Sequence, residues 1–143
     1  KAYLNRLKSL VDYYKITQNV IFLGRVEKEA LRELYSSCRI FVFTSPFENF
    51  AYTLIEAMSC SAPIITTNTT AMPETCGKAA LYFSPNAEDE LCSHILLFLN
   101  NEKIRLQYKR LSFSKAQEVD TYYAVNKKTN AILEGLIKPK EVK

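Results

Sequence analysis

The chain has 143 residues, a length typical of one domain and sufficient to bury a core without disulfides or metal ions. Hydrophobic residues make up 48% and charged residues 24% of the sequence, as in ordinary globular proteins rather than disordered ones. No apolar run approaches the roughly 20 residues of a membrane span, and the N-terminus does not resemble a signal peptide. The sequence therefore predicts a cytoplasmic globular domain.

The net charge of +4 is concentrated at the two ends of the chain. Residues 1–15 contain four basic residues against one acidic residue, and residues 126–143 contain five against two. The middle of the chain is slightly acidic. A nucleic-acid surface needs basic residues clustered on one face, usually together with aromatic side chains. We therefore expect no nucleic-acid partner.

The four cysteines are far apart without a C-x-x-C pair, and His94 is the only histidine. Zinc sites need several such ligands at short spacing, so we expect no bound metal. Free thiols are typical of a reducing cytosol. A single histidine also leaves no Ser-His-Asp arrangement for nucleophilic hydrolysis, and we interpret His94 as an ordinary residue on a helix face.

Along the chain, short apolar runs alternate with amphipathic segments. Apolar residues at helical spacing predict helices within residues 3–14, 30–35 and 54–58. Continuous apolar runs predict buried parallel strands at residues 20–23, 40–43, 63–65 and 80–83. Strands that alternate with helices are typical of right-handed βαβ units. The predicted fold is α/β, a Rossmann-like doubly wound parallel sheet with helices on both faces.

The C-terminal third is predicted to be helical. Asn86, which is followed by acidic residues, is expected to cap a helix that ends near Asn100. Further helical patterns at about 102–119 and 121–136 predict a helical C-terminal cap. We expect residues 1–137 to form one domain and residues 138–143 to be a flexible tail.

Ligands of doubly wound sheets bind beyond the carboxyl ends of the strands. In this chain that edge is expected to include residues 24–26, 44–52 and 66–73. Glu48 falls in the second segment, ahead of a helix that is predicted to begin near Ala51 or Tyr52. The free N–H groups of a first helical turn suit a phosphate.

Two glutamates flank this predicted helix start. Glu56 lies about one turn inside the helix, on the side away from its apolar residues, where a carboxylate can accept hydrogen bonds from a ribose diol. Glu48 can accept one from a second sugar beyond the phosphates. The spacing suits a molecule that is polar at both ends and anionic in the middle. The alternative is that both are ordinary solvated glutamates, since such a spacing is common by chance.

Several motifs occur in a fixed order around this E-x7-E element. Residues 19–26 read NVIFLGRV, residues 57–65 read AMSCSAPII, and residues 72–80 read MPETCGKAA. Together with Glu48 and Glu56, this set resembles the C-terminal, donor-binding domain of a retaining glycosyltransferase of the two-domain GT-B type, family 4 (the group 1 glycosyltransferases). The resemblance extends from about residue 3 to about residue 135.

The resemblance implies a role for each matching position. The residue matching Glu56 holds the ribose of a nucleotide diphosphate sugar, and the one matching Glu48 is the catalytic-site residue that holds a hydroxyl of the transferred sugar. The substrate is the nucleotide sugar itself, with no cofactor. The other implied donor-binding positions are Asn49, Phe50, Ala51 and Tyr52 through their amides, Thr53 beside them, and Gly24, Arg25 and Val26 along the base.

The chain departs from the family pattern in two ways. Asn49, Ala51 and Ser61 stand where the family usually has glycine, which lets backbone approach a ligand closely or take a positive φ. Family members also have a strand, a loop with a basic Arg and Lys pair, and an N-terminal acceptor domain ahead of this region. Nothing in this chain matches those parts. We therefore expect it to belong to a longer enzyme and to be inactive by itself.

The resemblance thus implies the donor-binding part of a cytoplasmic, metal-independent hexosyltransferase, as in polysaccharide biosynthesis. The whole enzyme would transfer a sugar with retention to a glycan, lipid or other acceptor. One alternative stays open: a non-catalytic nucleotide-sugar-binding module that needs a partner domain. Any peripheral membrane association would be through the missing domain. A phospho-receiver would need a reactive aspartate after a strand, and none of the three aspartates is in that position.

Overall fold

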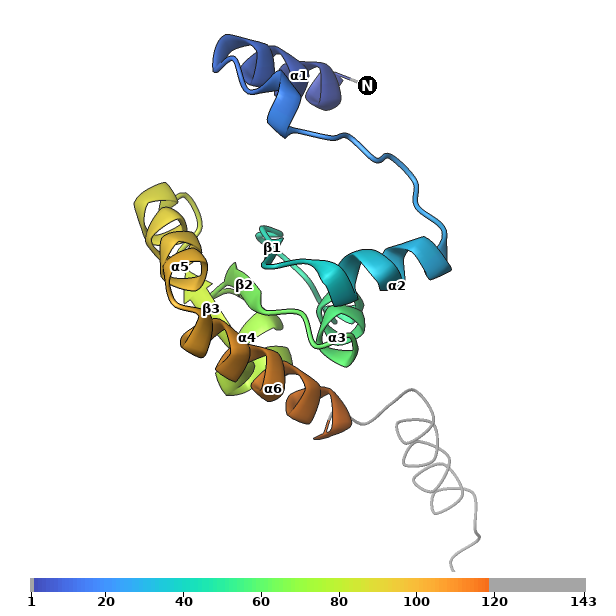
Figure 1. Cartoon of the computed structure of the whole chain (residues 1–143), viewed down its shortest axis with the longest axis vertical. Helices are drawn as coiled ribbons and strands as arrows, with labels where there is room; N and C mark the ends of the chain where they lie inside the picture. Colours follow the sequence, from blue (N-terminus) through green and yellow to red (C-terminus); the bar gives the residue numbers. More distant parts are fainter. Residues whose placement is uncertain (1, 119–143) are drawn as a thin grey trace, which may run out of the picture. The chain divides into compact units, whose positions relative to one another are not determined.

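A computed structural model describes residues 2–118 (Figure 1). The chain divides after Leu31 into two units. The helix predicted at 121–136 and the tail predicted at 138–143 lie outside the described residues.

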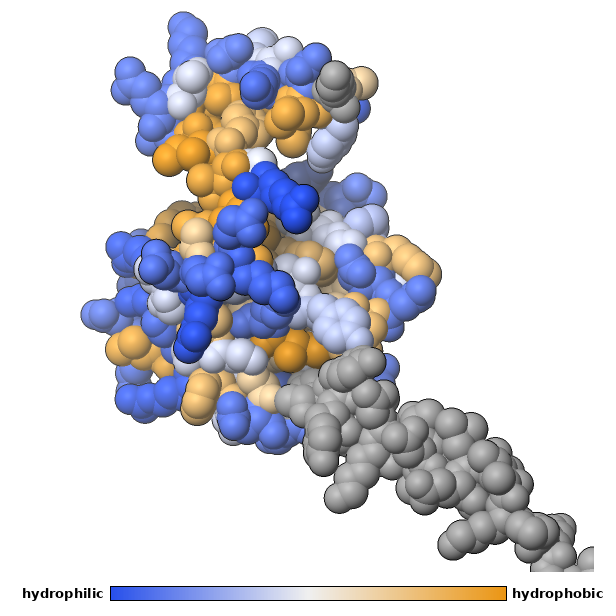
Figure 2. Space-filling view, turned by 90° about the vertical axis from the view of Figure 1, so that its right-hand side faces the viewer, coloured by the Kyte–Doolittle hydropathy of each residue, from blue (hydrophilic) through white to orange (hydrophobic). Residues whose placement is uncertain are grey.

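The first unit is mainly helical. Helix α1 (Ala2–Tyr13) is followed by the 3-10 helix η1 (Thr17–Asn19), an irregular segment and the start of helix α2 (Lys28–Ser37). No residue of α1 is buried, and Figure 2 shows many hydrophobic residues at the surface of this unit. Within the unit, the Lys8 ammonium lies 5.9 Å from the ring centre of Phe22, as in a cation–π contact.

The strand predicted at residues 20–23 is wrong for the described structure. Val20 has extended dihedral angles, with φ −120° and ψ 126°, but residues 20–23 pair with no strand within residues 2–118. Ile21 is 82% exposed. An apolar run predicts an extended segment, whereas a strand also needs a neighbour for its N–H and C=O groups.

The second unit contains a parallel sheet of three strands in the order β1-β2-β3. The strands are β1 (Phe41–Phe43), β2 (Ile64–Thr67) and β3 (Ala80–Phe83). Val42, Ile65 and Leu81 lie side by side in the register. The predicted strands are confirmed within two residues at each end, and β3 has the predicted bounds.

Helices cover both faces of this sheet. All four residues of β2 are buried, and successive side chains of a strand point to opposite faces, so both faces are packed. On one face, Ile65 and Phe83 form a core cluster with Phe98 of α5 (Glu88–Asn100). Leu54 and Met58 of α3 (Tyr52–Ser59) are also fully buried. The α/β Rossmann-like fold is confirmed.

A short helical crossover between β2 and β3 was not predicted. These two strands were predicted to follow one another directly, whereas α4 (Met72–Cys76) and the 3-10 helix η2 (Gly77–Ala79) lie between them. Pro73 lies in the first turn of α4, where a missing N–H costs no hydrogen bond. Five residues are too few to show a helical period, so the apolar pattern missed this helix.

The prediction that Asn86 caps α5 is wrong. The N-cap residue is Ala87, and Asn86 instead takes the left-handed conformation with φ 64°. Asparagine tolerates this conformation better than most residues, so it turns the chain into the helix. The carboxylate of Glu90, in the first turn, accepts a 2.7 Å hydrogen bond from the N–H of Ser84.

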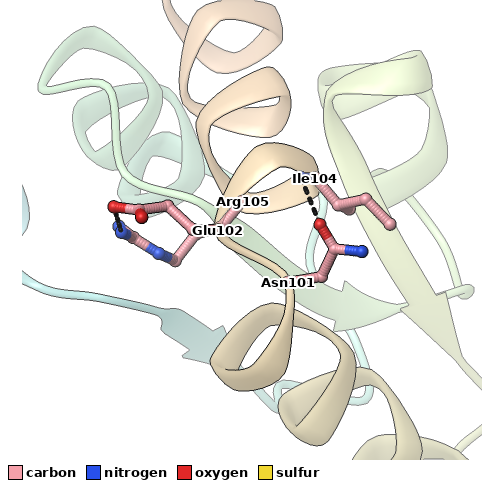
Figure 3. A network of polar contacts seen from close by, with 4 residues as sticks. All are labelled: Asn101, Glu102, Ile104 and Arg105. Atoms are coloured by element: carbon pink, nitrogen blue, oxygen red, sulfur yellow. Dashed lines mark hydrogen bonds and ion pairs between the residues drawn. The ribbon is translucent and has the colours of Figure 1, made fainter.

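Helix α6 (Glu102–Glu118) begins at an asparagine cap (Figure 3). The Asn101 side-chain oxygen accepts a 3.0 Å hydrogen bond from the N–H of Ile104, which is an N-cap bond to the third helical residue. One turn along, Arg105 and Glu102 form an ion pair of 3.3 Å. The predicted end of α5 and start of α6 are confirmed, while residue 119 lies outside the described part.

His94 has a structural role within α5. Its Nε2 atom lies 2.8 Å from the carbonyl oxygen of Tyr82 in β3, so this nitrogen donates the hydrogen bond. The contact joins the helix to the strand beneath it.

Of the helices within residues 2–118, none combines the length and the apolar composition that crossing a bilayer requires.

Candidate functional site

Threonine side chains hold together two loops at the carboxyl edge of the sheet. Residues 44–51 connect β1 to α3, and residues 68–71 connect β2 to α4. Two hydrogen bonds join these loops: Thr69 Oγ1 donates to the Pro46 carbonyl at 3.0 Å, and Thr70 Oγ1 accepts from the Glu48 N–H at 3.1 Å. A third comes from the end of β2, where Thr67 Oγ1 donates to the Ser45 carbonyl at 2.8 Å. The loop that carries Glu48 is therefore fixed along its length by its neighbour.

Thr70 takes a backbone conformation that is unfavourable for its type. Its φ is +48°, in the left-handed region, where β-branched residues are genuine outliers. Strain of this kind costs on the order of 1–3 kcal/mol and persists only where the surroundings impose it. Here the strained residue places its hydroxyl against the Glu48 backbone. Backbone strain of this kind is frequent at functional sites.

The start of α3 offers backbone N–H groups without acceptors. Its N-cap residue, Ala51, has no side-chain oxygen, and its carbonyl accepts from the N–H groups of Leu54 and Ile55. Within the described residues, no acceptor pairs with the N–H groups of four positions at this helix start: Asn49, Phe50, Ala51 and Thr53. Such a group of N–H donors at a helix N-terminus is suited to an anion.

The amide of Tyr52 differs from these four. Its N–H donates a 3.0 Å hydrogen bond to the Phe50 carbonyl within the loop, so it is already used. The rings of Phe50 and Tyr52 are tilted by 57° to each other, with centres 4.6 Å apart, and both side chains are exposed. The family resemblance predicts that this amide faces sugar and phosphates together with its neighbours, whereas here it donates a hydrogen bond within the turn into α3.

The three replaced glycines fall into two groups. Ser61, after α3, has a φ of +60°, so this position does require the left-handed conformation that glycine adopts most easily. Ala51 has a φ of −84° and is only 1% exposed. Neither Ala51 nor Asn49 takes a positive φ. At these two positions, a glycine would provide room for a ligand rather than conformational freedom.

Glu48 and Glu56 lie in different surroundings. The Glu48 side chain is half-buried in the loop, and Glu56 is exposed on α3, on the side opposite the buried Leu54 and Met58. The Tyr35 side chain is buried, and its ring lies edge-on to Phe41. Burial raises the pKa of the Tyr35 phenol, and the negative charge of Glu56 raises it further.

A hollow of about 260 Å³ opens beside this helix start. It is lined by Asn49 and Phe50 of the loop, and also by Glu74 of α4 and the half-buried Lys115 of α6. The Lys115 ammonium forms a 3.3 Å ion pair with Glu118. Neither Glu74 nor Lys115 was a candidate from the sequence, because α4 was not predicted and Lys115 lies 66 positions after Asn49. The run of threonines after β2 is the signal that could have pointed to this second loop.

Comparison with known proteins assigns the chain to a family. Residues 1–115 match the family model described as "Glycosyl transferases group 1". The chain belongs to this family. It is 40% identical over 84 residues to the O-antigen chain mannosyltransferase B of Escherichia coli, and 28% identical over 134 residues to the mannosylfructose-phosphate synthase of Agrobacterium fabrum.

The group 1 glycosyltransferase fold is shared with a larger solved enzyme. The sucrose-phosphate synthase of Thermosynechococcus elongatus superposes with a TM-score of 0.85 at 23% identity, over 94% of this chain and 34% of the other. The two sequence relatives are likewise longer. Their matches cover 59% and 92% of this chain but only 22% and 30% of the relatives themselves. The chain thus corresponds to less than a third of either relative.

The remaining predicted site residues of the chain lie in its first unit. Gly24 has a φ of +67°, with nothing within 4 Å of the position of an added Cβ, and Arg25 and Val26 follow it. Glu48 and residues 49–56 belong to the second unit, together with the threonines that hold them. Within residues 2–118, no three histidine, cysteine or acidic side chains gather in a group that would suit a metal ion.

Proposed function

We propose that this chain binds the donor substrate, a nucleotide diphosphate sugar, in a retaining group 1 glycosyltransferase. One observation carries the proposal. Four N–H groups without acceptors within the described residues lie at the start of α3, between Glu48 on the loop and Glu56 one turn into the helix. The donor has the matching order of groups, with a sugar, a diphosphate and a ribose. The names of the relatives support mannose as the transferred sugar.

In this proposal the diphosphate takes the centre of the site. Its charge grows as the bond to the sugar breaks, and fixed N–H dipoles that point at a developing charge are an effective source of catalysis. The amides at the start of α3 would stabilise that charge, and Glu48 would hold a hydroxyl of the sugar. Glu56 would accept hydrogen bonds from the ribose. The donor's own phosphate would help to deprotonate the acceptor, so the chain itself provides no general base.

The second candidate is a donor-binding module without catalytic activity. The internal hydrogen bond of the Tyr52 amide and the Cβ of Ala51 favour it, because both reduce what the helix start offers to a phosphate. The two candidates differ in turnover after the chain is joined to an acceptor-binding domain. Both predict the same donor binding by residues 48–56.

Titrations with two ligands test the shared part of the proposal. Nucleoside diphosphate and nucleotide sugar are each titrated into the parent chain, Glu48→Gln and Glu56→Gln. A hydrogen bond to a charged group contributes about 1.5–3 kcal/mol, so each loss is roughly 10- to 100-fold in affinity. Glu56→Gln should weaken both ligands, whereas Glu48→Gln should weaken only the nucleotide sugar.

Glu33→Gln is the matched control, because Glu33 is an exposed glutamate on α2 outside the proposed site. It should bind both ligands as the parent does. An equal loss for both ligands in Glu48→Gln, or no loss in Glu56→Gln, would falsify the assignment of the two carboxylates.

A further inference from the structure

A second hollow, of about 550 Å³, lies along the exposed side of α6. None of its lining residues lines the hollow beside Asn49 and Phe50. Most of the lining comes from α6, and Ser61 at the end of α3 completes it. The packing of α3 against α6 therefore forms this hollow, and the donor proposed above does not occupy it.

The charge of this second hollow is entirely positive. Lys109 and Arg110 line it, and no carboxylate does. Two other cations of the same helix are neutralised, since Arg105 pairs with Glu102 and Lys115 with Glu118. Within residues 2–118, neither Lys109 nor Arg110 takes part in an ion pair. The hydroxyl groups of Ser61 and Ser114 add hydrogen-bond donors at the same place.

Large apolar side chains alternate with these basic side chains along the helix. Leu106 and Phe113 line the same hollow, and they are 41% and 50% exposed. Arg110 follows Leu106 by four residues and precedes Phe113 by three, so the three side chains share one face of the helix. The ligand that fits this composition carries an anionic group and an apolar part together.

We propose that this surface of α6 docks onto a bilayer that contains anionic phospholipid, with a lipid phosphate between Lys109 and Arg110. Leu106 and Phe113 then enter the apolar part of the interface, as in other interfacial helices. Free phosphate would leave both apolar side chains in water.

Vesicle binding by the full chain tests the docking surface. The chain should sediment with phosphatidylcholine vesicles that contain about 30% phosphatidylglycerol and not with pure phosphatidylcholine vesicles. Arg110→Gln and Lys109→Gln should each weaken binding about fivefold, which is the effect of roughly one elementary charge near an anionic surface. Phe113→Ser should weaken it roughly tenfold, because an apolar side chain no longer enters the interface.

The matched control is Lys78→Gln, which removes an exposed positive charge from η2 outside this hollow. It should bind vesicles as the parent does. Unchanged circular dichroism of each variant confirms that folding is intact.

Three outcomes would overturn the proposal. One is equal binding to both kinds of vesicle, and another is an equal loss in Lys78→Gln and Arg110→Gln. The third is that inorganic phosphate, or a glutamate-rich peptide, displaces more of the chain from vesicles than chloride does at the same ionic strength. The first would show that anionic lipid is not recognised, and the second would show an unspecific attraction of the whole chain. The third would identify a soluble anion or an acidic protein segment as the ligand.

Discussion

The hydroxyl of Thr70 accepts a 3.1 Å hydrogen bond from the backbone N–H of Glu48, across two loops that are separated by β2 and α3. Thr70 keeps this position at a φ of +48°, which a β-branched residue rarely adopts. Its hydroxyl also lies 3.7 Å from the sulfur of Met72, which is fully buried. The bond to Glu48 therefore connects the candidate sugar-binding residue to the core through a strained residue.

Thr70→Val should impair the sugar part of donor binding. Valine keeps the branched shape and loses the hydroxyl, so the Glu48 loop loses one anchor worth about 1 kcal/mol. We expect an affinity for nucleotide sugar about fivefold lower and an unchanged affinity for nucleoside diphosphate, measured by calorimetry. Thr70→Ser, which keeps the hydroxyl, is the control and should bind both ligands as the parent does. Equal losses for both ligands in the valine variant would contradict a role confined to Glu48.

Chelation of divalent metal should leave donor binding unchanged. The proposed site handles the diphosphate charge with backbone N–H groups at the start of α3. Calorimetric titration of nucleoside diphosphate, with and without EDTA, should give the same affinity within twofold. A collapse of the affinity on chelation would show that a cation accompanies the diphosphate.

Asn101→Ala should destabilise the fold by about 1 kcal/mol, because it removes the side-chain cap of α6. Denaturant unfolding followed by circular dichroism measures this loss. Asn101→Asp keeps an oxygen acceptor at the cap and serves as the control, with stability close to that of the parent. A parent-like stability of the alanine variant would mean that water replaces the cap without cost.

The stability of the chain should fall as the pH rises above about 9. Burial raises the pKa of the Cys76 thiol to about 12, and burial also raises the pKa of the Tyr82 phenol. Above the pKa of the unfolded thiol, the unfolded chain releases a proton that the folded chain keeps. Each such group therefore lowers the free energy of unfolding by up to about 1.4 kcal/mol per pH unit between the two pKa values.

Cys76→Ala should reduce this slope between about pH 9 and pH 10.5. Cys92→Ala is the control, because Cys92 is exposed on α5 and should leave the slope unchanged. Urea unfolding at a series of pH values measures both variants. If the free energy of unfolding of Cys76→Ala falls with pH as steeply as that of the parent, other groups cause the alkaline loss of stability.

The local pattern was sufficient to predict the buried parts of the second unit. The apolar runs at residues 40–43, 63–65 and 80–83 predicted β1, β2 and β3, and such runs are typical of strands in a parallel sheet that is covered by helices. The start of α3 was predicted within one residue because apolar residues at helical spacing follow a loop. The assignment to the group 1 glycosyltransferases followed from motifs in a fixed order, and the family match confirms it.

Interactions between distant segments decided the rest. Residues 20–23 have the composition of a strand, but a strand exists only through hydrogen bonds to a neighbour, and the described residues supply none. The five residues of α4 carry no readable period. The bond from Glu48 to Thr70 joins residues 22 positions apart, and the hollow of Asn49 is completed by Lys115. The sequence by itself determined the family and the three strands of the second unit, and it predicted Glu48 and Glu56 as site residues. Only the tertiary structure decided which side chains fix the backbone of the Glu48 loop and line the hollow beside it, because these contacts join segments that are far apart in the sequence.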